Sequence, residues 1–314
     1  MGWVTEPIPQ KAEVILSVVA ALHHLTRYRY DRPVDLGPHI VRLRPAPHCR
    51  TRIASYSLKV TPAAHFINWQ QDPHGNWLAR LVFPEPTTEF SITVDLTAEM
   101  SVINPFDFFV EGYAARLPFA YPADLQSDLS AYLELDDDGP LLDAAVAALA
   151  PDDQPTVDYL VGLNAQLQRD IRYLVRLEPG VQTPDETLSL GSGSCRDSAW
   201  LLVQMMRKLG LAARFVSGYV YSPYVSRESP GRIGGGHTHA WVRIFLPSCG
   251  WVEFDPTNGI VGNADLVRVA ITRDPRQATP LHGTWAGEAG DFLDMDVTVD
   301  VRTESEFTPQ PSLA

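Results

Sequence analysis

Cysteine is scarce in this sequence, which has only Cys49, Cys195 and Cys249 among its 314 residues. An odd and sparse set does not form the disulfide framework that holds many small secreted domains together. We therefore expect a reducing compartment and a cytoplasmic location. Any chemistry that depends on a thiol must use one of these three side chains.

Positive charge and long apolar runs are also in short supply. The chain has 25 Lys and Arg against 38 Asp and Glu, a net charge of −13. This balance argues against binding to nucleic acid or to an anionic membrane surface, because both need clustered basic residues. The N-terminal run "VILSVVAAL" is much shorter than the roughly 20 residues that span a bilayer, and Glu6 and Glu13 before it are atypical of a signal peptide. We expect no nucleic-acid partner and no membrane partner.

Metal-binding motifs are missing as well. The sequence has no Cys-x-x-Cys, no His-Glu-x-x-His and no EF-hand loop. The acidic stretch "ELDDD", residues 134–138, is interpreted as a solvated turn rather than a metal site. We expect no metal and no cofactor.

The first third of the chain has the pattern of β-structure. Apolar residues alternate with polar ones from Phe90 to Leu96, which is typical of a strand with one buried face. The turn signal "DPHG", residues 72–75, separates two aromatic-rich runs and predicts a hairpin. We expect an antiparallel β-sandwich or barrel domain over residues 1–105.

Helical patterns follow, and they give an α+β fold class for the whole chain. Residues 106–155 are predicted to be a Pro-rich linker with a helical segment, and residues 156–314 a second domain that includes a C-terminal strand. Apolar spacings of three and four predict an amphipathic helix from Val157 to Ile171. A second helix is predicted to start at or near Cys195 and to stop before Gly210. Strands are predicted in "ARFVSGYVY", "HAWVRIFL", "GWVEFD", "LVRVAIT" and "MDVTVDV".

Cys195, His239 and Asp255 form the set of residues that points to catalysis. A helix start places partial positive charge beside a thiol, and a nearby imidazole can take its proton. The segment "HAWVRIFLPSCGWVEFD" is predicted to be a hairpin whose ends bring His239 and Asp255 together, with His239, Trp241 and Arg243 on one face. A carboxylate there would fix the orientation of the imidazole.

Each of these residues also has a plainer interpretation. Cys195 could be a packed apolar thiol or, with His237 and His239, a zinc ligand; Asp255 before Pro256 could cap a turn. Main-chain N–H groups at the helix start could stabilise an oxyanion, and Gly191 and Gly193 would let a carbonyl approach. A second oxyanion donor is not identified by the spacing, with Gln182 as a weak candidate.

Three segments resemble the core of the transglutaminase-like superfamily, which is similar in architecture to papain-type thiol proteases. They are "GSGSCRDSAWLLVQMMRKLGLAARFVSGYV", "HTHAWVRIFLPSCGWVEFDPTNG" and "VAITRDPRQATPLHG". The stretch "LHHLTRYRYDRPVDLGPHIVRLRPAP" resembles the β domain that precedes this core in bacterial members, some of which are described as cysteine proteases. The resemblance implies a papain-like core with Cys195 as nucleophile, His239 as base and acid, and Asp255 as the orienting carboxylate.

The function predicted on this basis is a thiol enzyme that acts on protein or peptide amides through a thioester. Hydrolysis is favoured because exclusion of water would need a dedicated pocket that the sequence does not show. The alternatives are transfer to an amine, as in a transglutaminase, and a catalytically inactive binding module. The Gly-rich loop over residues 221–236 is predicted to border the cleft as a lid or rim. The sequence does not predict an oligomeric state.

Overall fold

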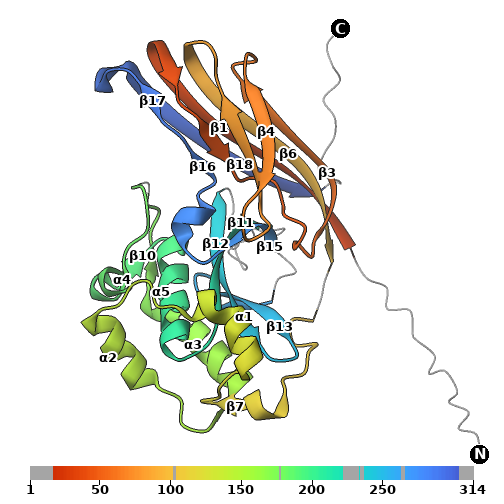
Figure 1. Ribbon diagram of the computed structural model, residues 1–314, viewed down its shortest axis with the longest axis vertical. Coiled ribbons are helices and arrows are strands. Elements are labelled where there is room, and N and C mark those ends of the chain that lie inside the picture. Colours follow the sequence, from red (N-terminus) through yellow and green to blue (C-terminus); the bar gives the residue numbers. More distant parts are fainter. Residues whose placement is uncertain are drawn as a thin grey trace, which may run out of the picture.

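The N-terminal part of the chain is a two-sheet β-sandwich. The computed structural model describes residues 17–101, 104–176, 178–221, 233, 237–262 and 266–303. One sheet has the order β17-β1-β6-β3, with β18 also paired to β1, and the other has the order β16-β2-β5-β4 (Figure 1). The strands are β1 (Ser17–Leu36), β2 (His39–Val41), β3 (Arg52–Thr61), β4 (Phe66–Gln71), β5 (Trp77–Val82), β6 (Thr87–Ser101), β16 (Leu281–His282), β17 (Trp285–Ala286) and β18 (Phe292–Thr303).

Local sequence patterns explain most of this sandwich. Phe90, Ile92, Val94 and Leu96 are buried between the sheets, as their alternation predicts. The predicted hairpin is formed by β4 and β5, and its turn is closed by Asp72, whose carboxylate accepts hydrogen bonds from the main-chain N–H groups two and four residues later. The antiparallel β domain is therefore confirmed.

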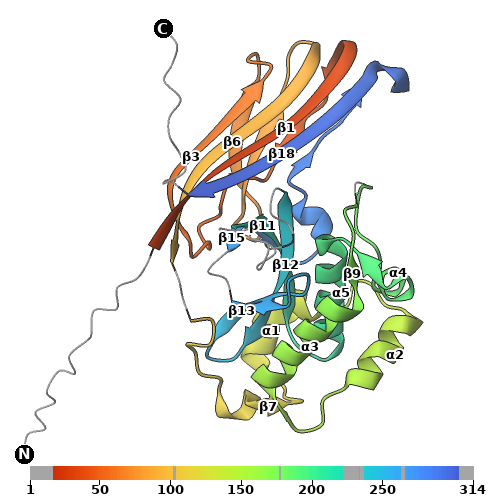
Figure 2. The same cartoon turned by 180° about the vertical axis from the view of Figure 1, so that it is seen from behind.

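The C-terminal strand belongs to this sandwich rather than to the second part of the chain. β18 pairs with β1 along almost its whole length, from Tyr30↔Phe292 to Ala20↔Thr303, and the two strands lie side by side in the rear view (Figure 2). Ion pairs of Arg27 with Asp296 and of Arg29 with Asp294 join their exposed faces. The sequence predicts this strand within the second domain, residues 156–314, and the structure differs. A pattern of alternation predicts a strand but not its partner, so the pairing could not be derived from it.

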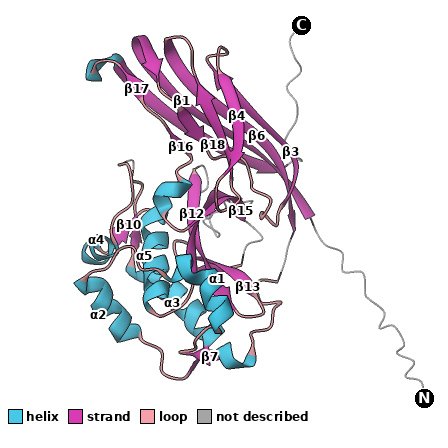
Figure 3. Ribbon diagram, in the orientation of Figure 1, coloured by secondary structure: helices cyan, strands magenta, loops and turns pink. Residues whose placement is uncertain are grey.

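The second part of the chain packs helices against a five-stranded sheet of order β14-β13-β12-β11-β15 (Figure 3). Its sheet strands are β11 (Ala213–Val220), β12 (Thr238–Leu246), β13 (Gly250–Asp255), β14 (Ile260–Val261) and β15 (Leu266–Thr272). Its helices are α1 (Ala123–Leu133), α2 (Pro140–Leu149), α3 (Thr156–Asp170), α4 (Pro184–Leu190) and α5 (Cys195–Lys208). Short strands β7 (Arg116–Leu117), β8 (Gln154–Pro155), β9 (Arg172–Tyr173) and β10 (Ser192–Gly193), and 3₁₀ turns at Gly112–Ala114, Pro275–Ala278 and Ala289–Asp291, complete the described elements.

Helix α5 is the centre of this domain. It is buried on nearly every side, because α1–α4 surround it and β11 and β12 cover the remaining face. Ala240, Val242 and Ile244 of β12 face it and share its apolar core. None of the helices in the described ranges has both the length and the apolar character needed to cross a membrane.

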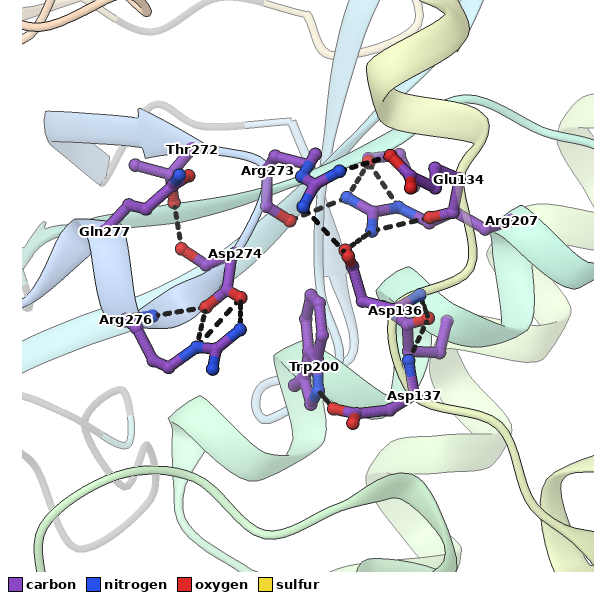
Figure 4. A network of polar contacts seen from close by, with 12 residues as sticks. Glu134, Asp136, Asp137, Trp200, Arg207, Thr272, Arg273, Asp274, Arg276 and Gln277 are labelled. Atoms are coloured by element: carbon purple, nitrogen blue, oxygen red, sulfur yellow. Dashed lines mark hydrogen bonds and ion pairs between the residues drawn. The ribbon is translucent and has the colours of Figure 1, made fainter.

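The acidic segment 134–138 is anchored to α5 by a polar network (Figure 4). Asp136 lies 2.6 Å from the guanidinium of the buried Arg207 and 3.1 Å from that of Arg273, and Asp137 accepts a hydrogen bond from Nε1 of Trp200. The side chain of Asp136 is only 14% exposed. The expectation of a solvated turn is therefore wrong for this residue, since its carboxylate is the counter-charge of a buried arginine.

Gly218 in β11 lets Trp241 of β12 pack against the sheet. A methyl group at this position would clash with the carbonyl oxygen of Val267 and would lie 2.7 Å from the Trp241 ring. We expect Gly218→Ala to lower the free energy of unfolding by about 2 kcal/mol, as overpacked cores do. Urea denaturation measures this change.

Gly162, in the middle of α3, is the matched control, because a methyl group there would meet nothing within 4 Å. Gly162→Ala is expected to stabilise the protein by about 0.5–1 kcal/mol, the helix propensity difference. Equal effects of the two substitutions would contradict the close packing at Gly218.

Candidate active site

Cys195 is the first residue of α5. Ser194 caps the helix in an extended conformation, so the thiol lies beside the N–H groups of the first turn, which have no intrahelical acceptor. The side chain is buried with 7% exposure, and it is a free thiol. The predicted position at a helix start is confirmed.

Asp197 fixes the geometry of this helix start. It is completely buried, and its carboxylate accepts hydrogen bonds from the main-chain N–H of Ser194 at 2.7 Å, the Ser194 hydroxyl at 2.8 Å and the main-chain N–H of Gln182 at 2.8 Å. Nε of Arg176 lies 2.9 Å away and supplies the opposite charge. Asp197 therefore links the start of α5 to the preceding loop through hydrogen bonds, and these bonds fix the position of Cys195.

Gly193 allows this close approach. A methyl group at Gly193 would lie 2.8 Å from Cβ of Asp197 and 2.9 Å from Oε1 of Gln182. The same Oε1 accepts a hydrogen bond from the hydroxyl of Thr187 in α4. Gln182, the weak candidate from the sequence, thus lies against the segment that leads into Cys195.

His239 and Asp255 lie together at the ends of their hairpin. Nε2 of His239 is 2.7 Å from Oδ2 of Asp255, and each residue is only 1% exposed. Nδ1, the other ring nitrogen, is buried and has no hydrogen-bond partner among the described residues. The predicted neighbourhood of the two residues is observed, whereas His237, the other candidate histidine, is exposed.

The sulfur of Cys195 interacts with the same imidazole. Burial lowers the pKa of His239, but the Asp255 carboxylate and then the Cys195 sulfur outweigh it and raise that pKa to about 10. Sγ and Nδ1 do not meet the geometric definition of a hydrogen bond. Because Asp255 occupies Nε2, Nδ1 is the nitrogen left for the sulfur. The three residues are therefore brought together, with the ring between thiol and carboxylate.

Asn258 is a member of this cluster that the sequence reasoning missed. Its Nδ2 donates to Oδ2 of Asp255 at 2.7 Å, and its main-chain N–H and that of Thr257 donate to Oδ1. These bonds and the charge of His239 hold the pKa of Asp255 below its usual value, although burial acts to raise it. The signal was present in "DPTN", where a side-chain amide follows the carboxylate at turn spacing.

Trp241 forms one wall beside the imidazole. Its ring stacks on that of His239, with centroids 6.0 Å apart and planes inclined by 24°. The Trp241 side chain is fully buried and packs against Gly218. The interpretation of Trp241 as core or pocket wall agrees with this position.

The other two thiols lie in different surroundings. Burial raises the pKa of Cys49, and it raises that of Cys249 to about 11. Within the described residues, no group of three or more His, Cys, Asp or Glu side chains could hold a metal ion. The predicted lid, residues 221–236, lies outside the described residues except for Tyr221 and Ile233.

Family models match both parts of the chain. Residues 20–99 match the bacterial transglutaminase-like N-terminal region, and residues 143–256, which include Cys195, His239 and Asp255, match the transglutaminase-like superfamily. The chain belongs to the transglutaminase-like superfamily. The α+β fold and the family predicted from the sequence are both confirmed.

Relatives of similar length match most of the chain. The uncharacterized protein Rv2569c of Mycobacterium tuberculosis is 29% identical over 294 residues, covering 88% of this chain and 90% of the relative. ML0607 of Mycobacterium leprae is 24% identical, covering 88% and 96%. A crystal structure of "a Putative Cysteine Protease" from Cytophaga hutchinsonii has a TM-score of 0.65 at 19% identity, covering 93% of each chain. This superfamily is a family of thiol enzymes, and the chain shares its fold.

Proposed function

We propose that this transglutaminase-like protein is a thiol hydrolase of protein or peptide amides, with Cys195 as nucleophile. The observation that carries the proposal is the buried imidazole of His239, whose Nε2 is hydrogen-bonded to Asp255 and whose pKa is raised in part by the Cys195 sulfur. A ring with a raised pKa keeps a proton at neutral pH, which favours a thiolate–imidazolium pair beside the helix start.

The reaction has two halves. The thiolate attacks the carbonyl carbon, a C–S bond forms, and the negative charge moves to the carbonyl oxygen. The main-chain N–H of Cys195 and the side-chain amide of Gln182 are the proposed hydrogen-bond donors to this oxygen. The C–N bond then breaks as Nδ1 of His239 gives its proton to the departing amine, which leaves a thioester. His239 next takes a proton from the water that attacks the thioester, the C–S bond breaks to release the acid, and the thiolate–imidazolium pair is restored.

The geometry of the described residues is compatible with transfer to an amine in place of water. We expect incubation with a glutamine-containing peptide library and a biotinylated primary amine to give hydrolysed products without the tag, detected by mass spectrometry. Tag incorporation would identify the protein as a transglutaminase instead.

The Cys195→Ala variant is the control, and it is expected to give neither product. Products that persist in this variant would contradict the thiol mechanism. A wild-type protein that yields no product and whose Cys195 is no more reactive than Cys49 would support the second alternative, a binding module.

A further inference from the structure

The face of the core sheet away from α5 carries a group of buried charges that the proposed reaction does not use. Arg214 of β11, Arg243 of β12 and Glu253 of β13 lie in register across three neighbouring strands, and Arg268 of β15 lies opposite Gly218. The exposure of each of these side chains is 7% or less. Of the three guanidinium groups, those of Arg243 and Arg268 lie within 4 Å of the Glu253 carboxylate.

Several of these charged groups lack hydrogen-bond partners. Glu253 Oε1 lies 2.7 Å from Nε of Arg268, without the geometry of a hydrogen bond, and 3.9 Å from Nε of Arg243, which is too far for one. Nη2 of Arg268 is also buried without a partner. Arg243 uses one nitrogen to donate to the carbonyl of Trp251 at 2.7 Å. Buried donors of this kind cost free energy until an acceptor reaches them.

The excess of positive charge acts on the pKa values of the group. Burial lowers the pKa of Arg243 to about 8, and the neighbouring Arg268 and Arg214 add to the effect while Glu253 opposes it. Burial also lowers the pKa of Arg214 to about 10. An additional negative charge would relieve this repulsion.

Arg243 and Arg268, but not Arg214, line a cavity of about 380 Å³ between the sheet, the N-terminal domain and the segment that joins the two parts of the chain. Arg243 and Arg268 form its charged wall, and Glu253 lies beside them. Arg50 lies at the rim, as does the exposed Asp107. The remaining wall is largely apolar and includes Pro105, Phe108, Phe109, Trp251 and Val252. This volume lies in the usual range for small-molecule sites, about 300–1,000 Å³.

We propose that this cavity binds a small organic acid, whose carboxylate or phosphate pairs with Arg243 and Arg268 and whose apolar part lies against Phe108 and Trp251. Guanidinium groups match both anions in a bidentate manner. The site is separate from the triad: Arg243 is four residues along β12 from His239, about 13 Å at the rise of a strand. The proposal does not depend on the enzymatic activity.

Calorimetric titration of the full-length protein with four probes tests the proposal: phenyl phosphate, benzoate, inorganic phosphate and benzamide. We expect saturable binding of phenyl phosphate or benzoate, and the tighter of the two identifies the anionic group. Benzamide has the shape of benzoate without its charge, and inorganic phosphate lacks the ring, so both should bind roughly tenfold more weakly or not at all. Equal affinity for benzamide would overturn the proposal, and so would failure of both aromatic acids to bind.

Three variants locate the binding. Arg268→Gln is expected to lower the affinity for the preferred acid by roughly tenfold or more, which is the effect of losing one charge-assisted hydrogen bond. Arg50→Gln changes an exposed residue, so folding is not at risk. It should lower the affinity for the acid about threefold, because one positive charge at the rim of the cavity is lost. Arg52→Gln, at another exposed arginine outside this cavity, should leave the affinity unchanged. Unchanged affinity in both cavity variants would place the ligand elsewhere and refute the assignment.

Discussion

Asp255→Asn is expected to lower amide turnover by roughly three to four orders of magnitude, the effect of the equivalent change in other triads. Both carboxylate oxygens of Asp255 accept hydrogen bonds: Oδ1 from two main-chain N–H groups, and Oδ2 from Asn258 and His239. An asparagine must place its NH₂ group toward one of these sets. Main-chain N–H groups cannot change into acceptors, so the NH₂ group turns toward His239.

This orientation reverses the proton arrangement of the ring. Nε2 of His239 must then accept a hydrogen bond, and the ring proton moves to Nδ1, the nitrogen that Asp255 leaves for the sulfur. A neutral imidazole that is already protonated on that side cannot take the thiol proton.

Turnover of a peptide amide selected by substrate profiling measures the effect, with thermal denaturation to show that the variant folds. Asp274→Asn is the control, since Asp274 pairs with Arg276 away from the triad and should keep normal turnover. Near-normal turnover of Asp255→Asn would remove Asp255 from the triad.

Asp197→Ala is expected to lower the free energy of unfolding by about 3–5 kcal/mol, the usual cost of leaving one partner of a buried ion pair without its counter-charge. The carboxylate is fully buried and binds two main-chain N–H groups, one hydroxyl and Arg176, so its removal leaves all four donors without an acceptor. Because these bonds hold the start of α5, the variant should also lose the reactivity of Cys195.

Urea denaturation gives the stability change as a shift in midpoint at a similar slope. Asp143→Ala is the matched control: Asp143 pairs with Lys208 at the surface, where its side chain is 60% exposed, and its loss should cost about 1 kcal/mol or less. A loss of under 1 kcal/mol for Asp197→Ala would mean that other contacts position the helix.

The parts of the fold that local pattern governs could be predicted from the sequence. Alternation in Phe90–Leu96 and the spacing after Cys195 correspond to β6 and α5, and the hairpin of β12 and β13 brings His239 to Asp255. In each case the partners are close in sequence or are set by a single turn, so the periodicity of one segment contains the information.

The remaining features depend on contacts between distant segments. Strand β18 pairs with β1 across most of the chain, Arg176 reaches Asp197 from another loop, and Asp136 neutralises Arg207. The arginines of the cavity come from separate strands and from the loop before β3. The periodicity of one segment does not predict these contacts with distant segments. Each charged residue, taken alone, is equally compatible with a solvated surface.

Alkylation of Cys195 by iodoacetamide at pH 6.5, followed residue by residue with mass spectrometry, tests most directly whether His239 activates the thiol. Cys49 and Cys249 serve as internal references, because burial raises the pKa of both. We predict that Cys195 is labelled at least 100-fold faster than either, the gain expected when a thiol is ionised at this pH, and that His239→Ala removes the difference. Labelling of Cys195 at the rate of Cys49, or fast labelling that survives His239→Ala, would contradict the account.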